Sequence, residues 1–310
     1  MRIRGFLLFP GQGAQCIGMA RDVYEAGGYA RALFDEASEI LKFDLPRLVF
    51  HGDEKQLART ENCQPAILVA SLALLAALRE RREVVMTGAA GLSLGEYTAL
   101  VALESIDFGD AVRLVRRRGE LMEKAAQGRE SGMAAVLGLT AEEVERICSE
   151  ASAQGMGMVT AANYNAPGQI AISGDRAALA RACELAKAAG AQRVMPLAVT
   201  GAFHSALMEP AREGLKQALA EVMVRPPQAR FVNNADAREI NDPQEIKDSL
   251  VRQLVSAVRW EQSCRLLVAS GETVFYEVGP GKVLQGMMKK IAPEASVTSV
   301  RSLADIEALG

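Results

Sequence analysis

The segment GLSLGEYTAL, residues 91–100, places one serine between two glycines directly after an apolar stretch. The pattern Gly-x-Ser-x-Gly at a strand-to-helix turn is typical of a nucleophile elbow, a turn so tight that only glycine fits two residues either side of the serine. The unpaired N–H groups of the helix N-terminus would favour developing negative charge beside Ser93. A second interpretation is a capping box, in which Ser93 caps the helix and Glu96 lies three residues on. This segment alone leaves both interpretations open.

The apolar residues 84–90 predict the strand that leads into this turn, and residues 6–9 predict another strand. Such runs alternate with amphipathic helical stretches, for example residues 108–126. This alternation predicts an α/β fold with a mostly parallel sheet. The longest apolar run, residues 66–78, is too short to span a membrane. It predicts a buried helix whose first turn holds Pro65.

Between residues 129 and 200 the pattern changes to the order β-α-β-β-α-β. The expected strands are residues 133–139, 158–166, 169–173 and 193–199, and the expected helices are residues 141–154 and 176–190. This is the order of the split ferredoxin-like unit. We therefore predict a ferredoxin-like subdomain, residues 129–200, inserted into an α/β-hydrolase-like catalytic domain formed by residues 1–128 and 201–310.

The composition is that of an ordinary globular chain, with 310 residues of which 49% are hydrophobic and 24% charged. A net charge of -3 gives no overall attraction to nucleic acid or to an anionic membrane. Basic residues at 116–118 and 289–290 are candidate local docking points for an acidic partner. The five cysteines lack CxxC spacing, so we expect reduced thiols, no metal site and a cytoplasmic location. We expect a monomer.

A serine nucleophile requires a base, and the chain has two histidines. His51 lies in a turn-like stretch and is predicted to be a surface loop residue. His204 follows the predicted subdomain at a strand-to-helix junction, and its place after Ser93 matches the chain order of α/β hydrolases. His204 is therefore the candidate base, with a structural role as the alternative. No motif marks an acid between Ser93 and His204, so a carbonyl or amide is expected to orient the imidazole.

Arg118 lies within the apolar stripe of the 108–126 helix, whereas its neighbouring arginines point elsewhere. A guanidinium that faces inward is costly to bury unless an anion meets it. A core carboxylate in a structural salt bridge is one such anion. A substrate carboxylate, held by the planar fork of Arg118, is the other.

The turn PGQG, residues 10–13, follows the first predicted strand. It lacks the third glycine of a dinucleotide fingerprint, and no acidic residue ends a second strand at the required place. We therefore expect no dinucleotide cofactor. A backbone N–H of this turn could instead face Ser93 and complete an oxyanion hole.

Seven segments resemble, in order, the motifs of malonyl-CoA:acyl carrier protein transacylases and of the related acyltransferase domains of polyketide synthases. They are FPGQGAQ, GLSLGEYTAL, RRRGELM, NYNAPGQIAISG, GAFHSALM, VRQLVSAVRW and YEVGPGKVLQGMMKKI. The resemblance runs from residue 6 to about residue 291. It implies transfer of a malonyl group from malonyl-CoA, through a malonyl-serine ester, to the phosphopantetheine thiol of an acidic acyl carrier protein in fatty acid or polyketide synthesis. No cofactor or metal beyond the coenzyme A thioester substrate is implied.

The resemblance also implies roles for single residues. Ser93 is the nucleophile, His204 its base and Arg118 the clamp for the malonyl carboxylate. Gln253 orients His204 through its backbone carbonyl. The remaining residues are an oxyanion hole of the Gln12 and Leu94 N–H groups, and the pocket positions Gln64, Met122, Asn163, Asn165 and Phe203.

Two features depart from the family's pattern. Leu92 stands where the family commonly has histidine, and VSAVRW lacks a proline often found in that motif. We expect neither departure to abolish activity. Three rivals remain open: a thioesterase, a polyketide trans-acyltransferase with another carrier, and a non-catalytic carrier-binding protein.

Overall fold

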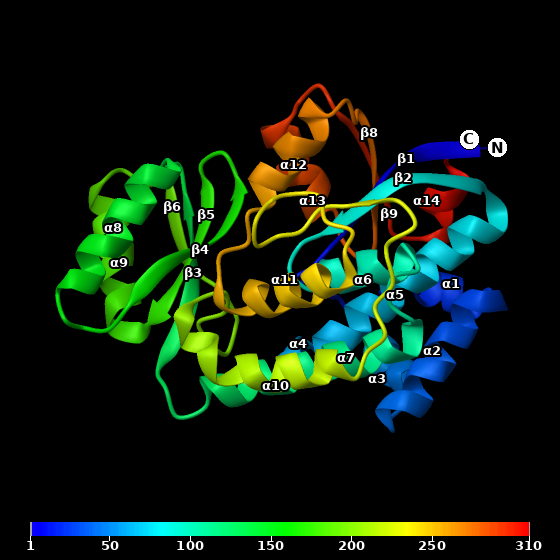
Figure 1. The fold of residues 1–310 in the computed structure, drawn as a ribbon, viewed down its shortest axis with the longest axis horizontal. Helices are drawn as coiled ribbons and strands as arrows, with labels where there is room; N and C mark the ends of the chain where they lie inside the picture. Colours follow the sequence, from blue (N-terminus) through cyan, green and yellow to red (C-terminus); the bar gives the residue numbers. More distant parts are fainter. Residues whose placement is uncertain (1, 310) are drawn as a thin grey trace.

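The computed structural model describes residues 2–309, which form two separate sheets with helices around them (Figure 1). Sheet A has the strand order β7-β2-β1-β8-β9, and every neighbouring pair is parallel. This confirms the predicted α/β fold with a parallel sheet. Its strands are β1 (Arg2–Phe9), β2 (Glu83–Gly91), β7 (Arg230–Phe231), β8 (Val274–Val278) and β9 (Ser296–Val300).

Sheet B is antiparallel and has the order β4-β5-β3-β6. With helices α8 and α9 it forms the green lobe of Figure 1 and has an apolar core of its own. The predicted order β-α-β-β-α-β is confirmed. The elements are β3 (Ser131–Leu137), α8 (Ala141–Ala153), β4 (Val159–Ala166), β5 (Gln169–Asp175), α9 (Arg176–Ala188) and β6 (Arg193–Pro196).

Strand β6 is shorter than the predicted strand, which extended to residue 199. Leu197 still donates its N–H to the Met133 carbonyl of β3 at 2.9 Å, but the Val199 N–H then turns back to the Leu197 carbonyl, which ends the pairing. Leu197 and Val199 line a cavity that lies between elements of the two sheets. The apolar residues that suggested a longer strand therefore line this cavity instead of extending β6.

The alternating side chains of β1 separate the two faces of sheet A. Phe6 and Leu8 pack in a cluster with α12 and α13, whereas Leu7 and Phe9 pack in the main core with α5 and α6. Helices therefore cover both faces, as expected of a parallel sheet. These helices are α5 (Thr60–Arg81), α6 (Gly95–Ala102), α12 (Trp260–Ala269) and α13 (Val283–Ile291).

The remaining helices complete the larger lobe in Figure 1. They are α1 (Arg21–Glu25), α2 (Gly28–Leu41), α3 (Leu45–His51), α4 (Glu54–Ala58), α7 (Phe108–Ala126), the short 3-10 helix η1 (Ala206–Met208), α10 (Glu209–Ala220), α11 (Pro243–Val255) and α14 (Leu303–Glu307).

Helix α5 is long and apolar enough to cross a membrane, but 89% of its most apolar window is buried within the fold, as in a core helix. It begins at Thr60, so the prediction that Pro65 lies in its first turn was wrong. Pro65 has no N–H to donate to the Glu61 carbonyl. That carbonyl instead accepts a hydrogen bond from Arg116 Nη1 of α7 at 3.1 Å. A side chain of the neighbouring helix thus replaces the missing helical bond.

Candidate active site

The turn between β2 and α6 holds Ser93 in a left-handed backbone conformation, with φ at 51°. A Cβ atom on Gly91 would lie 2.0 Å from the carbonyl carbon of Gly95. A Cβ atom on Gly95 would lie 2.1 Å from the carbonyl oxygen of Phe9, at the end of β1. Both positions therefore require glycine, which is the physical basis of the Gly-x-Ser-x-Gly pattern.

Ser93 and His204 form a hydrogen-bonded pair, with 2.8 Å between Oγ and Nε2. His204 Nδ1 lies 2.9 Å from the backbone carbonyl oxygen of Gln253, near the end of α11. Because a carbonyl only accepts, Nδ1 carries the hydrogen and Nε2 is free to accept from the serine hydroxyl. This is the tautomer that a general base requires.

The capping-box interpretation of Ser93 was wrong. The N-cap of α6 is Leu94, which makes no side-chain capping bond. The Glu96 carboxylate accepts instead from the Asn234 backbone N–H and from Gln253 Nε2. The other histidine, His51, is exposed at the end of α3 and hydrogen-bonds with Arg21.

Arg118 is 1% exposed and points into the site from α7. Its Nη1 donates to Gln64 Oε1 at 2.8 Å, and its Nη2 donates to Ser93 Oγ at 3.1 Å and to Gln253 Oε1 at 2.9 Å. Within residues 2–309 no carboxylate forms an ion pair with it. The alternative of a structural salt bridge was therefore wrong, because every partner of this buried cation is neutral.

Gly119 explains how Arg118 reaches this place. A Cβ atom on Gly119 would lie 2.6 Å from Glu61 Cα and 2.7 Å from the Thr60 carbonyl oxygen. Only glycine lets α7 approach the first turn of α5 so closely. The close crossing places Arg118 beside Gln64 of α5.

A cavity of about 210 Å³ opens beside the serine–histidine pair. Most of the predicted site residues line it: Gln12, Ser93, Leu94, Arg118, Met122, Asn163, Asn165, Phe203 and His204. Gln64 and Gln253 are completely buried and do not belong to its lining. Gln64, which the resemblance places in the pocket wall, lies behind Arg118 because its amide bonds Arg118 and the Met122 sulfur.

Sequence reasoning missed the apolar wall of the cavity. Its members come from distant segments: Met133, Leu197 and Val199, and, within the quoted segment YEVGPGKVLQGMMKKI, Val283, Leu284 and Met287. Asn234 was also missed, although the tandem asparagines after β7 are a visible signal. Its Oδ1 accepts from the Ser93 backbone N–H at 2.6 Å.

The backbone N–H groups of Gln12 and Leu94 belong to residues that line the cavity. Within residues 2–309 neither group has a hydrogen-bond partner. Leu94 also stands at the N-terminus of α6, where the helix dipole favours negative charge. Two unpaired donors are thus available to a developing oxyanion.

Burial sets the protonation behaviour of the site. Burial and the neighbouring Arg118 charge lower the pKa of His204 to about 4, against the opposing effect of the Gln253 carbonyl. His204 is therefore neutral near pH 7 and able to take a proton. Burial raises the pKa of Glu96, whereas the N–H groups of Asn234 and Gln253 and the charge of Arg118 lower it; because both oxygens face N–H donors, Glu96 is held as a carboxylate.

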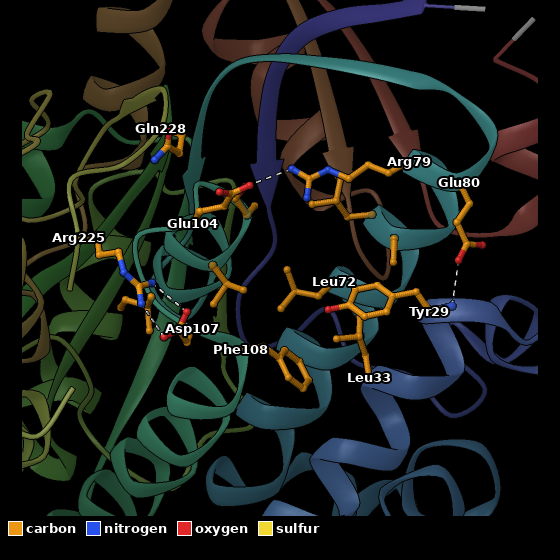
Figure 2. Close-up of a pocket in the computed structure, with 15 residues that line it drawn as sticks. Tyr29, Leu33, Leu72, Arg79, Glu80, Glu104, Asp107, Phe108, Arg225 and Gln228 are labelled. Atoms are coloured by element: carbon orange, nitrogen blue, oxygen red, sulfur yellow. Dashed lines mark hydrogen bonds and ion pairs between the residues drawn. The ribbon is translucent and has the colours of Figure 1, made fainter. Parts of the chain in front are cut away.

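A larger cavity, of about 780 Å³, lies among α2, α5 and the segment between α6 and α7 (Figure 2). Charged side chains that line it are already paired within its own lining: Arg225 pairs with Asp107 at 2.9 Å, and Glu80 accepts from the Tyr29 backbone N–H. Among the described residues that line it there is no serine, cysteine or histidine. The smaller cavity is therefore the candidate active site.

The family model for the acyl transferase domain matches residues 6–305. The chain belongs to the acyl transferase domain family. This acyl transferase is 44% identical over 300 residues to the malonyl CoA-acyl carrier protein transacylase of Bacillus subtilis (strain 168), covering 97% of this chain and 94% of that protein. The resemblance inferred from the seven segments is thereby confirmed.

Solved structures resemble this acyl transferase over almost their full length. The acyl carrier protein S-malonyltransferase of Vibrio cholerae matches with a TM-score of 0.94 at 40% identity, and the match covers 98% of this chain and 99% of that chain. A malonyl-transacylase in complex with a type II PKS acyl-carrier protein has a TM-score of 0.95 at 39% identity and covers 99% of this chain and 98% of its own. Both sheets thus belong to the shared fold.

Proposed function

We propose that this acyl transferase moves a malonyl group from malonyl-CoA to the phosphopantetheine thiol of an acyl carrier protein, in fatty acid or polyketide synthesis. The observation that carries the proposal is Arg118, a buried cation that no carboxylate within residues 2–309 pairs with, whose Nη2 lies 3.1 Å from the Ser93 hydroxyl oxygen. A carboxylate at the far end of a short acyl group would meet this charge while its thioester carbon meets Ser93.

The first step is acylation of Ser93. His204 Nε2 takes the hydroxyl proton as Oγ attacks the thioester carbonyl. The N–H groups of Gln12 and Leu94 bind the resulting oxyanion, and the Gln253 carbonyl holds the imidazole in its orientation. When the carbon–sulfur bond breaks, His204 returns the proton to the leaving coenzyme A thiolate.

The second step reverses the roles of the thiols. The carrier's phosphopantetheine thiol gives its proton to His204 and attacks the malonyl-serine ester. Ser93 leaves and recovers the proton, which restores the enzyme. Arg118 holds the malonate in both steps, and Met122, Asn163, Asn165 and Phe203 bound the pocket around it. These steps require no cofactor beyond the coenzyme A thioester, which is a substrate.

The remaining expectations belong to the same proposal. Residues 129–200 would be an inserted ferredoxin-like subdomain, and residues 1–128 and 201–310 the catalytic domain; the separate apolar core of sheet B supports this division. The carrier would be acidic and would dock on exposed basic residues such as Lys289 and Lys290; of the other predicted docking residues, 116–118, Arg118 is buried in the site and is not available to a carrier. The enzyme would act in the cytoplasm as a monomer.

Intact-mass measurement after mixing with malonyl-CoA tests the first step, because Ser93 acylation adds one malonyl group. Ser93→Ala should abolish the adduct and His204→Ala should remove most of it, in chains that remain folded. Adding a holo carrier protein tests the second step. Malonyl-carrier as the product supports transfer, whereas free malonate would indicate a thioesterase and no adduct a non-catalytic carrier-binding protein. Comparing fatty acid and polyketide carriers separates the two pathways.

A further inference from the structure

Two side chains hold the strained backbone of Ser93 from opposite sides. Asn234 Oδ1 accepts from the Ser93 N–H at 2.6 Å, and Gln253 Nε2 donates to the Ser93 carbonyl at 2.8 Å. Asn234 also donates through Nδ2 to the Gly91 carbonyl at 2.8 Å. A left-handed conformation persists at a non-glycine residue only when its surroundings enforce it. These two amides are the groups that enforce it here.

Glu96 joins the Asn234 backbone to the Gln253 side chain behind the nucleophile. Its Oε1 accepts from the Asn234 backbone N–H at 2.6 Å, and its Oε2 accepts from Gln253 Nε2. The side chain is completely buried, so water does not replace either contact. Both oxygens face N–H donors, which is the arrangement that a carboxylate requires.

The Gln253 amide also connects Glu96 to Arg118. Its Oε1 accepts from Arg118 Nη2 at 2.9 Å while its Nε2 donates to Glu96. A buried cation needs compensation, and a carboxylate one amide away supplies it without occupying the guanidinium directly. Asp236, His204, Tyr97 and Cys63 are the other titratable groups near this pair. Arg118 thus stays available to an acyl carboxylate.

We propose that Glu96 is a positioning residue for the reaction: it anchors Asn234 and Gln253, which hold Ser93, and it balances the charge of Arg118 through the Gln253 amide. This role would hold for any reaction of Ser93 with His204 as its base. Only the malonyl part of the test below rests on the proposed function. Glu96 touches neither reacting atom, so its effect must pass through these neighbours.

The test compares Glu96→Gln with the wild-type chain. The substitution keeps the size but turns one oxygen into an NH₂ group that faces an N–H donor. The first readout is labelling of Ser93 by phenylmethanesulfonyl fluoride: the serine O–S bond forms, the S–F bond breaks, fluoride leaves and His204 takes the proton. We expect its rate constant to fall at least about tenfold. Malonyl-serine formation should fall similarly at saturating malonyl-CoA, with KM changed less than about threefold.

Glu277→Gln is the matched control. Glu277 is also completely buried and accepts from the N–H groups of Leu284 and Gln285, but it contacts no group of the Ser93 network. This variant should lose a comparable amount of thermal stability while its labelling rate stays within about threefold of the wild-type rate. Equal labelling losses in both variants would show a general packing effect and overturn the proposal.

A double-mutant cycle with Asn234→Ala tests the route of the effect. If Glu96 acts through Asn234 and Gln253, the combined loss should be at least about fivefold smaller than the product of the single losses. Losses that multiply would overturn the proposal, as would a Glu96→Gln rate within about twofold of wild type.

Should Glu96→Gln fail to fold, Glu96→Asp carries the same comparison, since its shorter side chain withdraws the carboxylate from the Asn234 N–H and from Gln253 Nε2. A wild-type Ser93 that resists the reagent would also overturn the proposal. A labelled wild type without malonyl-serine would contradict only the proposed function, since the labelling rates still decide the role of Glu96.

Discussion

At the scale of the residue, the site depends on one buried cation whose partners are all neutral. Arg118 donates hydrogen bonds to the side-chain amide oxygens of Gln64 and Gln253 and to the Ser93 hydroxyl. Its guanidinium carbon lies 5.4 Å from the centre of the Tyr97 ring. Neutral acceptors stabilise a guanidinium less than a carboxylate does. The arrangement therefore leaves free energy to be gained when an anionic acyl group enters, which would be the physical basis of the proposed preference for malonyl over uncharged groups.

Arg118→Ala should lower malonyl-serine formation by at least about a hundredfold more than acetyl-serine formation, because only the malonyl group loses a charged contact. Competing malonyl-CoA and acetyl-CoA in one intact-mass experiment gives this ratio directly. Arg117→Ala is the control, since Arg117 is exposed one position away and pairs with Glu120. Equal losses for both acyl groups would assign Arg118 a purely structural role.

His204 should titrate with a pKa of about 4. Because the folded-state pKa lies below the unfolded value, His204 contributes stability that is present above about pH 6.5 and is lost as pH falls toward 4. The chain has two histidines, so His51→Gln leaves one imidazole for an NMR titration. Adding Arg118→Gln should raise this pKa, since a neighbouring positive charge is removed. A His204 pKa at or above 6.5 in the first variant would contradict the burial argument.

Leu92→His should change malonyl transfer by no more than about threefold. Leu92 packs against the apolar cluster of α12 and α13, and the proposed base that contacts Ser93 is His204. The proposed oxyanion donor, the Leu94 N–H, is a backbone group, which no side chain at position 92 removes. Steady-state transfer to a holo carrier measures the effect. A rise from near zero to a rapid rate would show that leucine disables the wild-type chain.

At the scale of the element, two tight approaches fix the distances between groups of the site. β2 and α6 meet at Gly91 and Gly95, and α5 and α7 cross at Gly119. The first pair is visible in the sequence because it flanks Ser93. The second is visible only as a glycine after three arginines, since nothing local says that another helix will cross there. The Glu61 carbonyl left free by Pro65 and bound by Arg116 belongs to the same crossing.

Gly119→Ala should destabilise the fold by about 1–3 kcal/mol, because the new methyl group meets backbone atoms that cannot turn away. The helices must separate, which withdraws Arg118 from Gln64 and should reduce the preference for malonyl-CoA. Thermal unfolding and the acyl-CoA competition measure the two effects. Gly286→Ala is the control: the residue lies within α13, a methyl group added there would meet no neighbouring atom within 4 Å, and the variant should be slightly more stable. Similar melting temperatures for both variants would contradict the crossing argument.

At the scale of the whole molecule, the sequence predicts the elements of sheet B, two strands of sheet A and the candidate chemistry, but not the contacts between distant segments. Local pattern and the scarcity of histidine indicate Ser93, His204 and Arg118, whereas no prediction covered β7, β8 and β9. The anchoring of Ser93 by Asn234 and Glu96 joins segments about 140 residues apart. The cavity wall also combines the end of β6 with α13. Such contacts arise only when the two sheets pack together, so no local signal carries them.

One of these long-range links connects the segment after α11 to sheet B, and its effect on the acyl pocket can be tested. Val258 donates its backbone N–H to Ala162 and accepts from Tyr164, so the segment after α11 pairs with β4, the strand that carries Asn163 and Asn165 into the cavity. Val258→Pro removes the donor and should loosen this alignment. We expect kcat/KM for malonyl-CoA to fall at least about tenfold, while labelling of Ser93 by phenylmethanesulfonyl fluoride stays within about threefold.

Ala257→Pro is the matched control for this last change. Within residues 2–309 the Ala257 N–H has no hydrogen-bond partner, and the preceding Ser256 has the extended backbone that a following proline requires. This variant should therefore keep its kcat/KM for malonyl-CoA and gain up to about 1 kcal/mol of stability from a less flexible unfolded chain. If Val258→Pro kept kcat/KM as well, sheet B would need no backbone link to the larger sheet to place its asparagines. If Val258→Pro slowed both reactions equally, the link would act on Ser93 itself rather than on the acyl pocket.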